Sequence, residues 1–224
     1  MGDRIAIIAA LPREIAGLVR GVPADAGLKL VGVHLYRVHG GVVVAAGMGE
    51  ERAAVAVEAV LAEGDVGMLV SAGLAGSCAA EASVGSVMEA GVVVDARTGE
   101  RFGVGGVTLA TTETIASVGE KARLREVFGA SMVDMEAATV ARIAEERGLG
   151  FRAIKGVSDA HDFELSSMAK FAGKRGSFRT GAFAAHTAAR PWTWGKAVML
   201  GRGSARALAG LEVALKAVLG EAVR

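Results

Sequence analysis

The sequence contains a single cysteine, Cys78, and only three prolines among its 224 residues. One cysteine excludes an internal disulfide and a cysteine-rich zinc site. No uncharged apolar run reaches the roughly 18 residues of a membrane-spanning helix. The first apolar run ends at Pro12, Arg13 and Glu14, too early for a signal peptide. We therefore expect a cytoplasmic protein.

The chain also lacks an excess of charge of either sign. Its 25 basic and 24 acidic residues leave a net charge of +1, which argues against nucleic acid as a partner. The four histidines follow no metal-binding spacing, and no glycine-rich segment matches a dinucleotide or phosphate-binding loop. We predict no bound metal and no cofactor.

Hydrophobic residues are abundant, at 52%, and glycine occurs 32 times. This composition and length predict one folded domain spanning residues 1–224. Apolar runs that alternate with helical patterns indicate an α/β fold with a mostly parallel, covered sheet. Strands are predicted at Ile5–Ala10, Leu28–Val38, Val42–Ala46, Met68–Ser71, Val84–Asp95, Val107–Ala110, Ser131–Met135 and Phe151–Val157; helices are predicted at Gly49–Glu63, Ser117–Phe128 and Glu136–Arg147.

The last third of the chain differs in composition. Between Leu165 and Leu211 there are eight Lys or Arg residues and no Asp or Glu, and half of the chain's ten aromatic residues lie there. We interpret residues from about 165 to 224 as helices on the flank of the sheet, ending in an amphipathic helix at Ser204–Leu219. One alternative is ordinary packing with a solvated basic face; the other is contact with an anionic membrane surface.

Three acidic residues follow predicted strands, where α/β sheets bind their ligands. Glu14 follows the first strand, Glu136 follows Ser131–Met135, and Asp159 follows Phe151–Val157. Carboxylates that are partly desolvated at such places can take part in proton transfer. The alternative is structural, with Glu14 and Glu136 as first-turn acids and Asp159 as a helix N-cap.

A glycine-rich segment, Ser71–Gly76, follows the strand Met68–Ser71. Its glycines would let backbone N–H groups approach a ligand closely. A tight strand-to-helix turn is an equally good interpretation of this segment.

Four segments of the chain carry a family resemblance: Ile5–Leu18, Ala45–Leu61, Ser71–Val94 and Val133–Asp162. The pair VDMEAA and GVSD in the last segment, at its observed separation, is the most specific signal. Together the segments resemble the purine nucleoside phosphorylase/nucleosidase superfamily, in its 5'-methylthioadenosine/S-adenosylhomocysteine nucleosidase-like branch. The resemblance implies a twisted mixed sheet flanked by helices, and a homodimer or higher homo-oligomer with its site near the subunit interface.

The resemblance also implies roles in cleaving a ribosyl bond to a purine. Glu14 would activate water, and Asp159, supported by Ser158, would protonate or share a proton with the purine N7. The remaining roles are ribose binding by Met135 and Glu136, base binding by Ile115 and Ala116, and a nucleophile side formed by Ala72, Gly73 and Lys155.

Water and phosphate are both candidate nucleophiles at this stage. Glu14 would repel phosphate, whereas Arg13 and Lys155 could attract it. Lys155 replaces an arginine and Leu74 replaces a serine or threonine that the nucleosidases would have. We favour hydrolysis, with a phosphorylase as the alternative, and an inactive nucleoside-binding module as a hypothesis of another class.

The 5' group of the nucleoside stays open at this stage. The Asp95–Val107 region is markedly shorter than in the nucleosidases, and Ile115 stands where an aromatic residue would stack on adenine. The segment from Arg190 to Leu211 looks like hopanoid-associated members of the superfamily, which release adenine from adenosylhopane. This resemblance would fit a lipid-tailed nucleoside and peripheral membrane contact.

Overall fold

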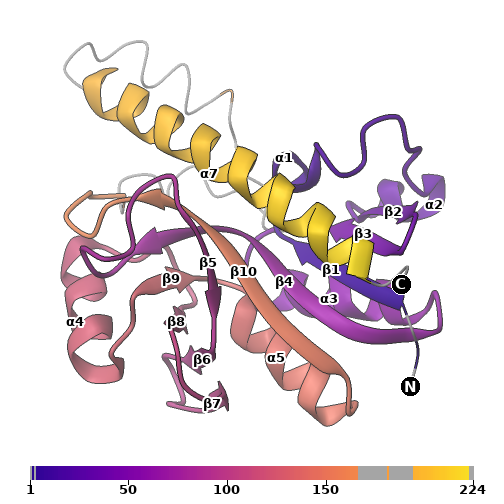
Figure 1. Cartoon of the computed structure of the whole chain (residues 1–224), viewed down its shortest axis with the longest axis horizontal. Coiled ribbons are helices and arrows are strands. Elements are labelled where there is room, and N and C mark those ends of the chain that lie inside the picture. The colour runs from indigo at the N-terminus through magenta and orange to yellow at the C-terminus, as the bar shows by residue number, and fades with distance from the viewer. Residues whose placement is uncertain (1, 3, 166–180, 182–193, 222–224) are drawn as a thin grey trace.

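The computed structural model describes residues 2, 4–165, 181 and 194–221. Its ten strands form one mixed sheet, in which β2–β3–β1–β4–β9–β8–β6–β7 are neighbours and β10 pairs with β4 and β5 (Figure 1). The strands are β1 (Arg4–Ala9), β2 (His34–Val38), β3 (Gly41–Ala45), β4 (Val66–Ser77), β5 (Val87–Ala90), β6 (Val92–Asp95), β7 (Arg101–Gly103), β8 (Thr108–Thr111), β9 (Met132–Asp134) and β10 (Gly150–Asp159).

Helices cover both faces of this sheet, which explains why its central strands are apolar without alternation. Ile5 and Ile7 of β1 pack toward the C-terminal helix, whereas Ala6 and Ile8 face the opposite layer. The helices are α1 (Pro12–Ile15), α2 (Ala26–Leu30), α3 (Glu50–Leu61), α4 (Val118–Phe128), α5 (Ala137–Glu146) and α7 (Trp194–Glu221). In Figure 1, α3 and α5 lie on one face, and α7 crosses the other above β4 and β10.

The expectation of a mostly parallel sheet is confirmed, with five parallel strand pairs and four antiparallel ones. The pairs β2–β3, β4–β9, β5–β10 and β6–β7 are antiparallel, whereas β1–β3, β1–β4, β4–β10, β6–β8 and β8–β9 are parallel. The mixed sheet implied by the family resemblance is confirmed.

Two predicted strands have different boundaries in the structure. Leu28–Val38 is not one strand, because Asp25 caps α2 by accepting hydrogen bonds from the N–H groups of Gly27 and Leu28, and β2 begins only at His34. Val84–Asp95 is broken at Gly91 into β5, which pairs with β10, and β6, which pairs with β8.

The glycine-rich segment Ser71–Gly76 is neither a loop nor a strand-to-helix turn. It continues β4 as far as Ser77, because β10 pairs with it from Gly150 to Asp159. This pairing makes Asp159 the last residue of β10 rather than a helix N-cap. Short β7 lies in the Asp95–Val107 region, where we predicted no strand.

The predicted C-terminal helix extends beyond Ser204–Leu219 to form α7. Leu211 and Leu215 of this helix are fully buried against the sheet. Most of the basic, aromatic stretch that precedes it lies outside the described residues, including Lys170, Lys174, Arg175, Arg179, Arg190, Phe171, Phe178, Phe183 and Trp192. None of the helices in the described ranges is long and apolar enough to cross a membrane.

Candidate functional site

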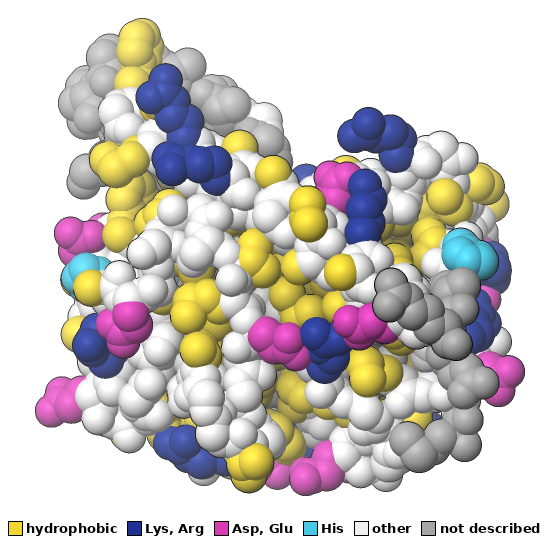
Figure 2. Space-filling view, viewed as in Figure 1, with side chains coloured by type: hydrophobic (Ala, Val, Ile, Leu, Met, Phe, Trp, Pro, Cys, Tyr) yellow, Lys and Arg dark blue, Asp and Glu magenta, His cyan; other side chains and the backbone are white. Residues whose placement is uncertain are grey.

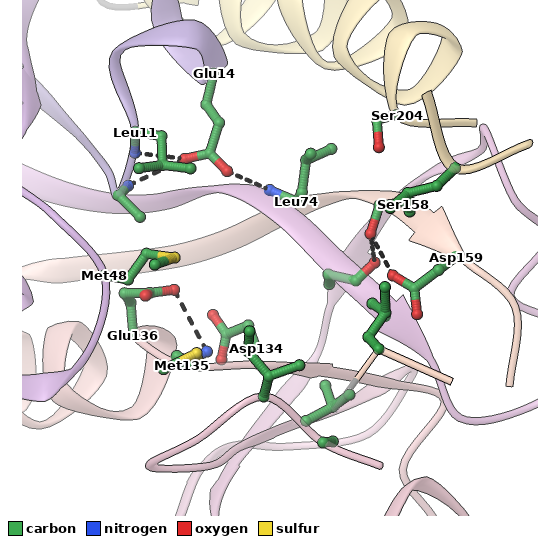
Figure 3. A pocket seen from close by; sticks show the side chains of 18 of the residues that line it. Leu11, Glu14, Met48, Leu74, Asp134, Met135, Glu136, Ser158, Asp159 and Ser204 are labelled. Carbon is green, nitrogen blue, oxygen red and sulfur yellow. Dashed lines mark hydrogen bonds between the residues drawn. The ribbon is translucent and has the colours of Figure 1, made fainter. Parts of the chain in front are cut away.

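A cavity of about 460 Å³ opens between the carboxyl ends of β1, β4, β9 and β10 and the inner side of α7 (Figure 3). It brings together the three carboxylates predicted from the sequence, although they come from three separate segments. Seven of the ten predicted site residues line it: Glu14, Ile115, Ala116, Met135, Glu136, Ser158 and Asp159. The other three, Ala72, Gly73 and Lys155, are not in its lining.

The side chain of Glu14 is held by backbone N–H groups at the start of α1. Its Oε2 accepts hydrogen bonds from the N–H groups of Ala10 (3.1 Å) and Leu11 (2.9 Å), and its Oε1 accepts one from Leu74 (3.1 Å). Gly73, at φ +140°, brings β4 so close that an added Cβ would lie 3.1 Å from Oε2. The glycine-rich stretch therefore presents an N–H group to Glu14 and leaves room for the carboxylate.

Glu136 stands at the N-cap of α5, directly after β9. Its Oε1 accepts a hydrogen bond from the N–H of Gly49 (2.8 Å), and its Oε2 accepts one from Met135 (3.3 Å). Burial raises the pKa of Glu136 to about 7, and the carboxylate of Asp134 adds to the rise. The positive charge of Lys155 and the Gly49 hydrogen bond act in the opposite direction. The group can therefore change its charge near neutral pH.

Lys155 is almost fully buried beneath the cavity, with its Nζ 2.8 Å from Asp134 Oδ2 and 2.9 Å from Ser71 Oγ. Burial alone would lower the pKa of Lys155, but Asp134, Glu136 and Glu14 together raise it above its ordinary value. Asp134 also accepts hydrogen bonds from the Thr111 hydroxyl and the Ala137 N–H. The Lys155 ammonium thus pairs with Asp134, and its positive charge also lowers the pKa of Glu136.

Asp159 has a charged partner that we did not predict. Its Oδ2 accepts a hydrogen bond from Lys121 Nζ at 2.5 Å, and its Oδ1 lies 2.5 Å from Ser158 Oγ. The side chains of Asp159 and Lys121 are both about 2% exposed. Lys121 itself lines the cavity and comes from α4.

Apolar residues form much of the remaining wall. Ile115 and Ala116 lie in the connection between β8 and α4. Leu11 and Met48 lie on the side of Glu14 and Glu136 in Figure 3. The contribution of α7 to the wall is Ala197, Leu200, Gly201, Ser204, Ala205 and Leu208.

Comparison with known proteins shows which solved structures share this fold. Residues 93–186 match the model of the phosphorylase superfamily. A Helicobacter pylori 5'-methylthioadenosine/S-adenosylhomocysteine nucleosidase, solved with butyl-thio-DADMe-Immucillin-A, is 15% identical, with a TM-score of 0.70 over 97% of this chain and 98% of that one. The chain has the phosphorylase-superfamily fold. The fold that the sequence motifs implied is thereby confirmed.

Two further solved structures share this fold. Helicobacter pylori futalosine hydrolase is 18% identical, with a TM-score of 0.62 over 74% of this chain and 88% of its own. A nucleosidase from Colwellia psychrerythraea in complex with adenine is 21% identical, with a TM-score of 0.60 over 71% and 84%. No curated protein matches the sequence. At these identities the likeness concerns the fold, and the function must be argued from the site.

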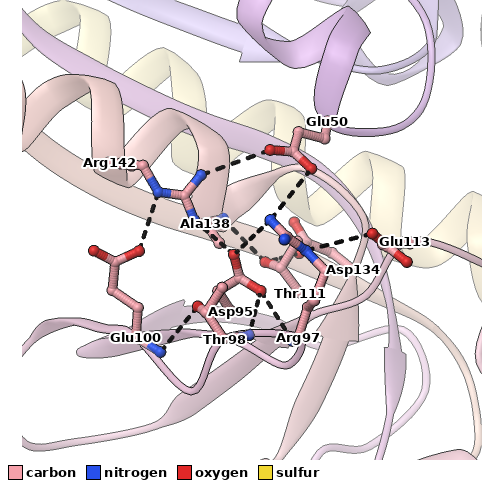
Figure 4. A network of polar contacts seen from close by, with 10 residues as sticks. All are labelled: Glu50, Asp95, Arg97, Thr98, Glu100, Thr111, Glu113, Asp134, Ala138 and Arg142. Atoms are coloured by element: carbon pink, nitrogen blue, oxygen red, sulfur yellow. Dashed lines mark hydrogen bonds and ion pairs between the residues drawn. The ribbon is translucent and has the colours of Figure 1, made fainter.

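Ion pairs connect the Asp95–Val107 region to α5 and to the start of α3 (Figure 4). Arg142 of α5 binds Asp95 (2.6 Å) and Glu100 (3.0 Å), and its guanidinium lies 3.7 Å from Glu50 at the start of α3. Arg142 lowers the pKa of Asp95 against the effect of burial, together with backbone N–H groups from Arg97 and Thr98. The network fixes the turn that precedes α3, which carries Gly49.

Asp134 and Lys121 are the charged site residues that our sequence reasoning missed. Asp134 lies inside the VDMEAA motif, so its place beside Met135 and Glu136 was a usable signal. Lys121 lies in a helix with several other charged residues, where a lysine is ordinarily a solvated residue. Only the structure shows that Lys121 of α4 pairs with Asp159 at the end of β10. Within the described ranges, no group of three His, Cys, Asp or Glu side chains could hold a metal ion.

Proposed function

We propose that this protein is an N-ribosyl hydrolase that cleaves the N-glycosidic bond of a 5'-substituted adenosine and releases adenine. The proposal is supported by three carboxylates, Glu14, Glu136 and Asp159, around one cavity large enough for a nucleoside. It is also consistent with the fold shared with 5'-methylthioadenosine/S-adenosylhomocysteine nucleosidases.

The chemistry needs opposite charges to be stabilised on the two fragments. Breaking the C1'–N9 bond builds positive charge on the ribose and negative charge on the purine, and groups that stabilise these charges bind the transition state better than the substrate. We assign Glu14 to water activation and Glu136, with Met135, to the ribose hydroxyls. Asp159, with Ser158, faces the purine N7, and Ile115 and Ala116 contact the base. The arrangement parallels glycoside hydrolysis, with its paired carboxyl groups.

The observation that carries the choice of water over phosphate is the setting of Glu14. Its carboxylate already occupies the N–H groups of Ala10, Leu11 and Leu74, which a phosphate dianion would otherwise need. Lys155, a candidate phosphate cation in the sequence, is engaged by Asp134 and Ser71 outside the cavity lining. The negative charge of Glu14 at this wall of the cavity favours water, which is neutral, over a phosphate dianion.

The first experiment measures free adenine after incubation with methylthioadenosine, adenosylhomocysteine, adenosine and an adenosyl lipid, with and without phosphate. We expect adenine without phosphate, and a Glu14→Gln variant should lose most of this activity. A strict phosphate requirement would instead indicate a phosphorylase. Absence of base release from all four compounds would indicate a nucleoside-binding module. The four rates also identify the 5' group, including the lipid tail suggested by the hopanoid-associated resemblance.

The surface of α7 supports a further part of this proposal, which is peripheral contact with an anionic membrane. The N-terminal half of α7 extends as an arm beyond the sheet, and hydrophobic and basic side chains gather on that arm in Figure 2. Trp194, Val198 and Met199 are more than half exposed, and Arg202 and Arg206 are exposed on the same half. Apolar and basic side chains together suit a membrane interface. The homodimer and the cytoplasmic location stay predictions.

A further inference from the structure

The Lys121–Asp159 pair joins a buried ammonium to the group that faces the leaving base. Lys121 Nζ donates to Asp159 Oδ2 (2.5 Å), to the carbonyl oxygen of Ala160 (2.9 Å) and to that of Phe163 (3.1 Å). An ammonium has three N–H donors, so all three are used within the protein. Lys121 therefore has no N–H left to bind a substrate directly, and any effect on the base passes through Asp159.

The same contacts determine which hydrogen-bond donors lie next to Asp159. One carboxylate oxygen accepts from an ammonium and the other lies beside the Ser158 hydroxyl. Asp159 is thus in hydrogen-bond contact with an N–H of Lys121 and with the hydroxyl of Ser158. Of these two donors an alkylammonium is the stronger acid, and Lys121 is positioned by α4, which is capped at Ser117.

Other groups near this pair do not compete for the proton. Cys78, which lies close enough to sense the charges of both Lys121 and Asp159, is a buried thiol, and burial raises its pKa to about 12. Ala160 and Phe163 offer only carbonyl oxygens. Glu120 and Arg125 lie on the same helix, with Glu120 paired to Arg123 and Arg125 near Glu81. Asp159 is thus the acceptor to which the Lys121 proton is directed.

We propose that Lys121 is the proton source for the departing purine and acts through Asp159; this inference rests on the proposed nucleosidase function. As the C1'–N9 bond breaks, its electron pair leaves with the purine. One proton moves from Lys121 Nζ to Asp159, and Asp159 passes a proton to N7. The base departs neutral, Asp159 is again a carboxylate, and Lys121 is left as a neutral amine that regains a proton from solvent.

The test compares two leaving groups in the full-length protein. Methylthioadenosine needs a proton on its base, whereas 4-nitrophenyl riboside releases a stable anion without one. For Lys121→Met we expect kcat on methylthioadenosine to fall about 100-fold or more, as for loss of a general acid. On the nitrophenyl compound we expect a change of about threefold or less. Equal losses on both would mean that Lys121 is only structural and would overturn the inference.

Two variants sharpen this comparison. Lys121→Arg keeps a positive charge but cannot release a proton at ordinary pH, so we expect it to be as impaired as Lys121→Met on the nucleoside. Recovery of activity in Lys121→Arg would show that charge pairing alone matters, against the proposal. Arg125→Met, one turn further along α4 and exposed, is the matched control and should behave as the wild type.

A second readout needs only the nucleoside. Without Lys121 the proton must come from solvent, so the kcat of Lys121→Met relative to wild type should rise about tenfold per unit of decreasing pH. A ratio that does not change with pH contradicts the proposal. If the wild-type protein releases no base from any nucleoside, the proposed function itself fails. If the wild type is active and Lys121→Met stays equally active, only the role of Lys121 fails.

Discussion

Single side chains in the cavity have charge states that can be tested directly. The pKa of Glu136 is raised to about 7 by burial and by Asp134. Its ionised form accepts the ribose hydroxyls most strongly, so kcat/KM should fall about tenfold per unit below pH 7. In Glu136→Gln this dependence should disappear, with a kcat/KM about 10-fold to 100-fold lower at pH 8. A pH–rate profile of both proteins checks this, and an unchanged profile in the variant would contradict it.

The same group should affect stability. Between its ordinary value of 4.5 and about 7, the folded protein holds a proton on Glu136 that the unfolded chain has lost. The contribution of Glu136 to stability therefore decreases as the pH rises through this window. Denaturation of the Glu136→Gln variant beside the wild type at pH 5 and pH 8 should show the variant relatively more stable at the higher pH.

The role of Asp159 in carrying a proton to the base can be tested with its amide variant. Asp159→Asn keeps a hydrogen-bond acceptor for Lys121 but cannot carry a proton to the base, so kcat on methylthioadenosine should fall about 10²-fold to 10⁴-fold. Circular dichroism should show a folded protein. Asp162→Asn, three residues further on and exposed, is the control and should keep full activity. Near-normal turnover of Asp159→Asn would remove Asp159 from its assigned role.

The strand β4 helps to hold Glu14 in place, because its backbone at Gly73 lies close to the Glu14 carboxylate. In Gly73→Ala, a Cβ would lie 3.1 Å from Glu14 Oε2, on a backbone with φ +140°. We expect Glu14 to shift by a few tenths of an ångström and kcat to fall about tenfold. Gly64→Ala, also at positive φ but with open space around it, should lose stability and keep activity. Equal kcat in the two variants would contradict this account.

The helix α7 gives a prediction about stability. Leu215 is fully buried between α7 and the sheet, so Leu215→Ala should lower the free energy of unfolding by about 2–5 kcal/mol. Val213, which is 70% exposed on the same helix, should tolerate the same change within about 0.5 kcal/mol. Chemical denaturation of both variants measures the difference. A small loss in Leu215→Ala would mean that α7 is loosely packed.

The predicted helices and strands can be compared with the observed ones. Apolar runs correctly indicated β1, β3, β8 and β9, and the helical pattern at Ser117–Phe128 correctly indicated α4. Ser71–Gly76 was misread because its glycines suggest a turn, whereas pairing with β10 decides its conformation. The carboxylates could be predicted from strand ends, but the Lys121–Asp159 and Lys155–Asp134 pairs could not, since each joins residues distant in the sequence.

For the whole molecule, the distribution of charge matters more than its near-zero sum. If the arm of α7 contacts a membrane, the protein should sediment with phosphatidylglycerol vesicles at low salt and much less at high salt. Arg202→Gln/Arg206→Gln should weaken this binding. Arg123→Gln/Arg125→Gln on α4 is the control for the same change in net charge. Equal binding to phosphatidylcholine vesicles, or no binding, would remove the membrane contact.

The walls of the cavity come from remote parts of the described chain, with Glu14 after its first strand and Leu208 in its last helix. While a ribosome is still making the chain, Glu14 and Glu136 can already have emerged, yet the wall supplied by α7 does not exist. A half-made polypeptide therefore has no enclosed pocket in which to capture a nucleoside. The ability to bind should be acquired in a single step, when α7 docks, rather than growing with the length of the nascent chain.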